Sequence, residues 1–188
     1  FSLEMWGGAT FDVCLRFLRD DPWERLARLR EAVPNILFQM LLRGANVVGY
    51  KSYPNNVIKQ FVKESRAAGI DIFRIFDCFN QLSQMQVALE AVKESGGIAE
   101  LAICYTGDLE LEEERLSRGQ PAKYTLRYFA EKATLFAEAG ADMIAIKDMS
   151  GLLRPHAAKK LIASLRDATD LPLHLHTHDA AGSQGASY

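Results

Sequence analysis

The sequence has no excess of charge of either sign, few cysteines and no long hydrophobic run. Its 22 lysines and arginines nearly balance 24 aspartates and glutamates, so no electrostatic footprint for nucleic acid or an anionic membrane is present. Three dispersed cysteines predict reduced thiols rather than a disulfide framework. No apolar run reaches transmembrane length, and no signal peptide precedes the first predicted strand. We therefore expect an intracellular protein that binds neither nucleic acid nor membranes.

Short apolar runs alternate with amphipathic stretches along all 188 residues. Several runs are apolar at nearly every position, which is typical of parallel strands that are covered on both faces. Longer stretches between them carry helix signals, such as Asp21 before Pro22 and a glycine at position 69. The predicted strands are Ser2–Trp6, Ile36–Leu42, Ile70–Phe76, Glu100–Tyr105, Asp142–Ile146 and Leu171–Thr177.

This β-α alternation with short connections predicts a parallel sheet, either doubly wound or closed into a barrel. No strand is followed by a G-x-G-x-x-G loop, because the glycines of "WGGATFD" are adjacent, so the barrel is favoured. A (β/α)8 barrel of the TIM type needs about 250 residues. We therefore expect residues 1–188 to form part of a single barrel domain, with about six of eight strands and the first and last missing. The acidic stretch 108–123 interrupts the rhythm and predicts a surface loop or short helix.

Ionisable residues follow nearly every predicted strand, at the carboxyl edge where parallel barrels place their chemistry. Three of the four histidines lie in "LPLHLHTHDAAG", at every second position, so they share one face of a strand. Two neighbouring members can reach one metal ion, whereas three along a straight strand cannot. His176 and His178 lie nearest the carboxyl edge and are the metal-ligand candidates. His174 is expected to lie a layer deeper, and His156 at the surface.

Lys147 and Arg43 each follow a buried run. A buried ammonium is costly unless it is paired or chemically altered, so Lys147 either forms a salt bridge, with Asp148 or Asp77, or is carbamylated into an anionic metal ligand. The planar guanidinium of Arg43 suits a substrate carboxylate, and an ion pair in the barrel rim is the alternative. From the residues alone, both alternatives stay open.

Long motifs in order along the chain resemble the carboxyltransferase domain of the pyruvate carboxylase family. They are "EMWGGATFDVCLRFLRDDPWERL", "PNILFQMLLRGANVVGYKSYPNNV", "FRIFDCFN", "AICYTGD", "IKDMSGLLRP" and "HLHTHDAAG". Oxaloacetate decarboxylase α subunit and transcarboxylase 5S subunit share this domain. The segment "DAAGSQGASY" differs from the family pattern, which usually has threonine after the aspartate and no glutamine.

The resemblance implies a TIM-type barrel with a divalent metal, zinc or manganese. By motif position Lys147 matches the carbamylated lysine ligand, which is also the catalytic residue of the set, and His176 and His178 match the imidazole ligands. Arg43 matches the arginine that holds the carboxylate of pyruvate. Two further residues, Tyr50 and Asp12, match the lining of the pocket where biotin and substrate meet. A metal-ligating aspartate, a substrate-binding glutamine and a proton-shuttling threonine of the family are expected outside the 188 residues.

The implied activity is carboxyl transfer from carboxybiotin to pyruvate through an enolate, which gives oxaloacetate. Its partners are pyruvate and a biotin carboxyl carrier domain, and ATP is used by a separate domain of the full enzyme. A homo-oligomer is expected, in the cytoplasm or, in a eukaryote, in the mitochondrial matrix.

Three alternatives remain from the sequence. One is oxaloacetate decarboxylase or transcarboxylase activity. Another is a metal-dependent acyl-CoA lyase or condensing enzyme, which shares an H-x-H-D-like strand end but lacks a lysine ligand in the preceding strand. The third is a truncated, non-catalytic scaffold, and we expect the 188-residue chain by itself to be inactive.

Overall fold

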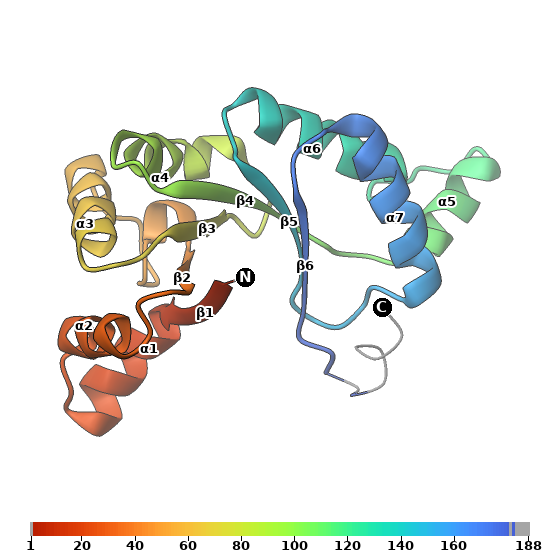
Figure 1. The fold of residues 1–188 in the computed structure, drawn as a ribbon. Coiled ribbons are helices and arrows are strands. Elements are labelled where there is room, and N and C mark those ends of the chain that lie inside the picture. The colour runs from red at the N-terminus through yellow and green to blue at the C-terminus, as the bar shows by residue number, and fades with distance from the viewer. Residues whose placement is uncertain (1, 181, 183–188) are drawn as a thin grey trace. The chain divides into compact units, whose positions relative to one another are not determined.

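Six β-strands form one sheet whose spatial order follows the sequence order from β1 to β6 in the computed structural model, which describes residues 2–180 and 182 (Figure 1). The pairings of β1 with β2, β2 with β3 and β5 with β6 are parallel. A doubly wound sheet reverses its strand order at a switch point, whereas successive βα units of a barrel do not. The predicted fold class, an incomplete α/β barrel, is therefore confirmed.

All six predicted strands are present, with shifted ends. Their bounds are β1 Ser2–Gly7, β2 Leu37–Leu42, β3 Ile72–Phe76, β4 Ile98–Cys104, β5 Met143–Asp148 and β6 Leu173–Thr177. The prediction ended the fifth strand at Ile146, but pairing with β6 continues through Lys147 and Asp148. The apolar run stops before the backbone ladder does, because a ladder depends on main-chain groups rather than on side-chain polarity.

Helices follow the strands, and the long ones match the predicted stretches. They are α2 Pro22–Ala32, α3 Asn55–Ala67, α4 Leu82–Glu94, α6 Leu126–Glu138 and α7 Pro155–Ala168. The predicted cap of α2 is confirmed, because the Asp21 carboxylate accepts a hydrogen bond from the Trp23 N–H at 2.8 Å. Gly69 follows α3 with a φ of 115°, a conformation that favours glycine at a helix end.

Two helical segments after β1 were not predicted. These are α1 (Gly8–Val13) and the π-helical turn η1 (Cys14–Leu18), which lie where the sequence indicated only a strand exit. The acidic stretch contains a short helix, α5 (Leu109–Ser117), one of the two predicted forms. None of the helices in the described part of the chain is long and apolar enough to span a membrane.

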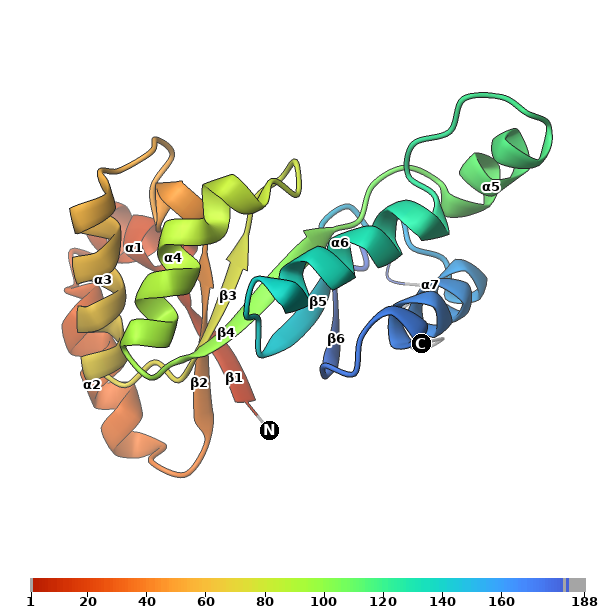
Figure 2. The ribbon, with the colours of Figure 1, turned by 90° about the horizontal axis from the view of Figure 1, so that it is seen from above.

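The chain divides into two compact units, which we describe separately. The first comprises Phe1–Asp77 and Gln81–Glu100, and the second comprises Cys78–Asn80 and Leu101–Tyr188. In the first unit α3 and α4 lie side by side (Figure 2), and in the second α6 packs against α7.

An aromatic cluster fixes the segment after β1 in the first unit. Phe11, Trp23 and Phe61 surround the buried Trp6, with ring centroids 4.9–6.0 Å from it. The Trp6 indole N–H donates to the Pro22 carbonyl at 3.0 Å. Aromatic pairs at such distances add to the stabilisation from burial alone. The cluster therefore joins β1, α1, α2 and α3 next to the carboxyl end of β1.

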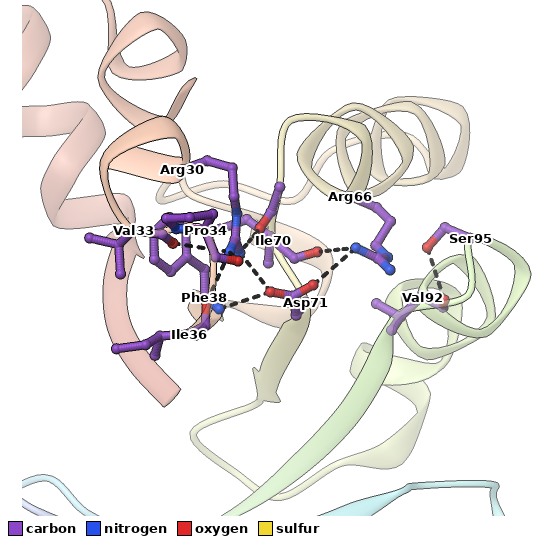
Figure 3. A network of polar contacts seen from close by, with 11 residues as sticks. Arg30, Val33, Pro34, Ile36, Phe38, Arg66, Ile70, Asp71, Val92 and Ser95 are labelled. Carbon is purple, nitrogen blue, oxygen red and sulfur yellow. Dashed lines mark hydrogen bonds and ion pairs between the residues drawn. The ribbon is translucent and has the colours of Figure 1, made fainter. Parts of the chain in front are cut away.

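A second contact network pins the amino-terminal ends of the strands of the first unit (Figure 3). The Asp71 carboxylate forms ion pairs with Arg30 at 2.6 Å and with Arg66 at 3.2 Å, and it accepts a hydrogen bond from the Phe38 N–H at 2.9 Å. The Arg30 guanidinium also lies 3.8 Å from the centroid of the Phe38 ring. In parallel barrels this end serves stability rather than chemistry. We therefore assign the Asp71 network to the fold.

Three polar side chains, those of Arg74, Glu100 and Gln39, are buried in the first unit, where the sequence predicted apolar strands. The fully buried Arg74 on β3 pairs with Glu4 on β1 at 2.5 Å and with the fully buried Glu100 on β4 at 3.1 Å. Gln39 on β2 donates to Glu100 and accepts from Ser2. Because each charge has partners, the network satisfies the requirement for burying ions.

Candidate functional site

The two strands at the end of the sheet align Lys147 with His176. In the β5–β6 ladder the Cα atom of Lys147 lies opposite that of His176, and Ala145 lies opposite His174. Residues that face each other across a parallel ladder point to the same side of the sheet, on strands about 4.8 Å apart. Lys147 is only 3% exposed, and His176 is half-buried with a buried Nε2 atom. The Lys147 side chain is thus buried and lies on the same face of the sheet as the His176 imidazole.

His178 joins this pair from the end of β6. Its ring centroid is 5.1 Å from that of His176, in an edge-to-face arrangement, and its side chain is exposed. The His178 N–H donates to the Asp148 carbonyl at 3.1 Å, so backbone pairing continues beyond the strand. The period of two therefore places Lys147, His176 and His178 on one face at the carboxyl end of β5 and β6. His174 lies two residues deeper on the same face.

Asp148, one of the two predicted ion-pair partners of Lys147, makes no ion pair with it among the described residues. Its carboxylate instead accepts the N–H groups of Leu152 and Leu153 at 2.9 and 3.0 Å and the Thr177 hydroxyl at 3.3 Å. Adjacent strand residues point to opposite faces, which directs Asp148 away from Lys147. This expectation was wrong: Asp148 fixes the loop after β5. The carboxylate of Asp77, the other predicted partner, accepts the N–H of Gln81 at 3.0 Å within the first unit.

In the first unit, Arg43 follows β2 and is half-buried. Its Nη1 donates to the carbonyls of Val48 and Gly49 at 3.1 and 3.2 Å, and its guanidinium lies 4.9 Å from the Tyr50 ring centroid. Those two are the hydrogen bonds that the Arg43 side chain makes within the described residues. Its Nη2 and Nε donors are therefore available for a planar anion such as a carboxylate.

Tyr50 links Arg43 to Asp12. The Tyr50 hydroxyl donates to the Asp12 carboxylate, which also lies 3.6 Å from the Arg16 guanidinium. Tyr50 is 67% exposed, so its ring presents an open aromatic surface. The three residues predicted to bind substrate or line its pocket, Arg43, Tyr50 and Asp12, thus form one chain of contacts within the first unit.

Two residues that support Arg43 were missed from the sequence. Val47 is buried with a φ of 53°, an outlier for a β-branched residue, and its carbonyl accepts the Arg43 N–H at 2.8 Å. Gly8 lies against the Arg43 guanidinium. Only the adjacent glycines gave any sequence signal, because strain and close approach depend on the tertiary structure.

Among the described residues, no three His, Cys, Asp or Glu side chains gather closely enough to hold a metal ion. Two imidazoles and a lysine make up the donor set instead. Imidazole nitrogen suits zinc and carboxylate-type oxygen suits manganese, whereas a protonated ammonium has no lone pair to donate. The residues therefore fit a divalent metal when Lys147 carries a carbamate, which converts its nitrogen into an anionic oxygen ligand.

Known proteins resemble this chain over nearly its whole length. The chain is 58% identical over 188 residues to pyruvate carboxylase from Staphylococcus aureus, covering 16% of that protein, and 51% identical to mitochondrial pyruvate carboxylase from Rattus norvegicus, covering 97% of this chain and 15% of the relative. Among solved structures, the carboxyl transferase domain of Rhizobium etli pyruvate carboxylase with pyruvate and biocytin has 55% identity and a TM-score of 0.90. That match covers 97% of this chain and 30% of the solved one.

The chain is homologous to part of the carboxyltransferase domain of pyruvate carboxylase. The predicted resemblance is confirmed by identities of 50% or more with relatives from bacteria, yeasts and mammals. The chain spans about a sixth of the length of the curated pyruvate carboxylases that it matches. No family model matches the sequence.

Proposed function

We propose that the protein containing this chain transfers a carboxyl group from carboxybiotin to pyruvate, as part of a pyruvate carboxylase. The observation that carries the proposal is the shared face of Lys147, His176 and His178 at the carboxyl end of β5 and β6. The homologous carboxyl transferase domain of the Rhizobium etli enzyme has been solved with pyruvate and biocytin, which supports the same ligands here.

In this proposal Lys147, as its carbamate, His176 and His178 hold a divalent metal, zinc or manganese. The metal would supply Lewis acidity toward the negative charge that develops on pyruvate. The family's aspartate ligand, expected outside the 188 residues, would complete the set. The pairing of Lys147 with His176 across the β5–β6 ladder supports this role, because the sheet would then orient both side chains before a metal binds.

Arg43 would bind the carboxylate of pyruvate through Nη2 and Nε, while its Nη1 stays fixed by two loop carbonyls. Tyr50 and Asp12 would line the pocket that receives biotin. The reaction breaks the N–C bond of carboxybiotin and forms a C–C bond at the methyl carbon of pyruvate. The proton that leaves this methyl group ends on the biotin nitrogen, and the threonine expected to carry it lies outside the chain.

The wider assignments follow the same homology. A biotin carrier domain, an ATP-using domain and a homo-oligomeric state would belong to the full enzyme, and a complete multifunctional pyruvate carboxylase from Rhizobium etli is among the similar structures. The predicted localisation stays a proposal, because relatives include bacterial enzymes and enzymes named mitochondrial. Lys147 at the end of β5 favours this family over acyl-CoA lyases and condensing enzymes, whose preceding strand has no lysine ligand.

The test measures bound metal and oxaloacetate formation in the full-length enzyme. We expect His176→Ala and Lys147→Arg to lose most of the bound metal and to lower carboxylation of pyruvate by about 100-fold, since removing a ligand disables Lewis-acid catalysis. Arginine keeps the positive charge but forms no carbamate ligand. ATP-dependent carboxylation of biotin should stay unchanged.

His156→Ala is the matched control, because His156 is exposed at the start of α7 and lies 3.7 Å from Glu110. It should keep both the metal and the activity. Full metal content in Lys147→Arg would refute the lysine as a ligand. Undiminished carboxylation of pyruvate by His176→Ala would refute the proposed function.

A further inference from the structure

Gly8 occupies a position where the protein has no room for a larger residue. It lies at the start of α1, directly after β1, and is buried. A Cβ atom built there would lie 2.6 Å from Cζ and from Nη2 of Arg43, and 2.7 Å from its Nη1. Such distances essentially never occur for a real Cβ atom. The Arg43 guanidinium therefore lies in space that only a glycine leaves empty.

The backbone of Gly8 does not itself require glycine. Its φ is not among the positive values found in the described residues, and it has helical geometry that alanine readily adopts. The three nearest atoms all belong to the far end of one flexible side chain. An added methyl group would therefore displace the guanidinium rather than the main chain.

Other contacts hold the guanidinium against Gly8. The carbonyls of Val48 and Gly49 bind Nη1, and the Tyr50 ring lies 4.9 Å from Cζ. The strained backbone of Val47 shapes this loop, and Val47 is joined to the Arg43 backbone by a 2.8 Å hydrogen bond. Gly8 on one side and the loop on the other thus confine Arg43 to one position.

We propose that Gly8 is a positioning residue for substrate binding, which acts by leaving room for the Arg43 guanidinium. This inference rests on the proposed role of Arg43 in binding the carboxylate of pyruvate. A displaced guanidinium would lose its bidentate geometry toward a carboxylate. Gly8 would therefore determine how well the enzyme binds pyruvate without touching pyruvate through a side chain.

The experiment is a double-mutant cycle in the full-length enzyme with pyruvate as the varied substrate. We expect Gly8→Ala to raise the KM for pyruvate about tenfold and to leave kcat within about twofold, as for the loss of uniform binding. In an Arg43→Ala background the same change should leave KM unaltered, because the side chain through which Gly8 acts is gone.

Gly97→Ala is the matched control. A Cβ atom there would meet Phe73 and Val92 at 3.0–3.1 Å, at the amino-terminal end of β4 and hence at the opposite edge of the sheet. It should alter thermal stability without altering the KM for pyruvate. ATP-dependent carboxylation of biotin should stay normal in all variants.

Three outcomes would overturn the inference alone: an unchanged KM in Gly8→Ala, an equal rise in KM in both backgrounds, or an insoluble Gly8→Ala protein beside a soluble Gly97→Ala protein. An unchanged KM in Arg43→Ala itself would instead remove the proposed role of Arg43, and the inference with it.

Discussion

At the scale of single residues, the side-chain amide of Asn80 pairs with the backbone of Cys104 as a peptide group would. This amide accepts the Cys104 N–H at 2.7 Å and donates to the Cys104 carbonyl at 3.1 Å, and it also donates to the Tyr128 hydroxyl. An asparagine amide carries the same donor and acceptor groups as a peptide. With a φ of 56°, Asn80 also occupies the left-handed region that asparagine tolerates better than most residues.

We predict that Asn80→Ala lowers the free energy of unfolding by about 2–4 kcal/mol, because buried backbone groups lose their partner and alanine is strained at this φ. Asn80→Gly loses the same hydrogen bonds without the strain and should be about 1 kcal/mol less destabilised. Thermal melting measures both, with the exposed Asn35→Ala as control. Equal melting temperatures for the wild type and Asn80→Ala would contradict this role.

At the scale of elements, α5 anchors the loop that follows it. Glu112 accepts the N–H groups of Lys123 and Tyr124 at 2.6 and 3.2 Å, and Glu113 accepts that of Leu126 at 2.8 Å, at the start of α6. The acidic run therefore accepts backbone hydrogen bonds as well as forming ion pairs with Arg115 and Arg118. The sequence predicted only a solvated surface for these carboxylates, but the bonds show that they fix a loop in place.

The hydrogen bond from Lys123 is the main cause that lowers the pKa of Glu112 below its ordinary value of 4.5. A lowered pKa in the folded state means that the ionised carboxylate stabilises the loop above pH 4.5, and that this stabilisation is lost as the pH falls through the folded-state pKa. We predict that the hydrogen-exchange protection of the Lys123 and Tyr124 backbone amides, corrected for intrinsic rates, falls as the pH is lowered below 4.5. Glu112→Gln should lower protection at neutral pH and remove its acid dependence.

Glu114→Gln is the control for this prediction, because Glu114 on the same helix pairs with Arg118 at the surface. It should leave the protection of Lys123 and Tyr124 unchanged. Protection in Glu112→Gln that still falls below pH 4.5 would assign the acid sensitivity to another group.

At the scale of the whole molecule, the features that could be predicted from the sequence are those that follow from the alternation of side chains along a strand. Strand alternation singled out His176 and His178, and the ladder pairs His176 with Lys147. The sequence did not reveal that Gly8 lies against Arg43. That contact joins residues that follow two different strands, and it depends on interatomic distances that only the tertiary structure sets. It also missed the ion pairs of Arg74, since a charge within an apolar strand is readable only once its partners on other strands are known.

The order of the strands leaves β1 and β6 at the two ends of the sheet, each with one neighbouring strand in the described part of the chain. Unpaired strand edges expose main-chain donors and acceptors, which favours association between copies.

We predict that the 188-residue polypeptide, expressed alone at micromolar concentration, forms oligomers in light scattering and neither binds stoichiometric metal nor carboxylates pyruvate. Leu3→Lys places a charge at an exposed position of β1 and should reduce the association. Leu116→Lys on α5, which is also exposed but lies away from an edge strand, should not. A monomer that binds metal and carboxylates pyruvate would show that these strands suffice for the site.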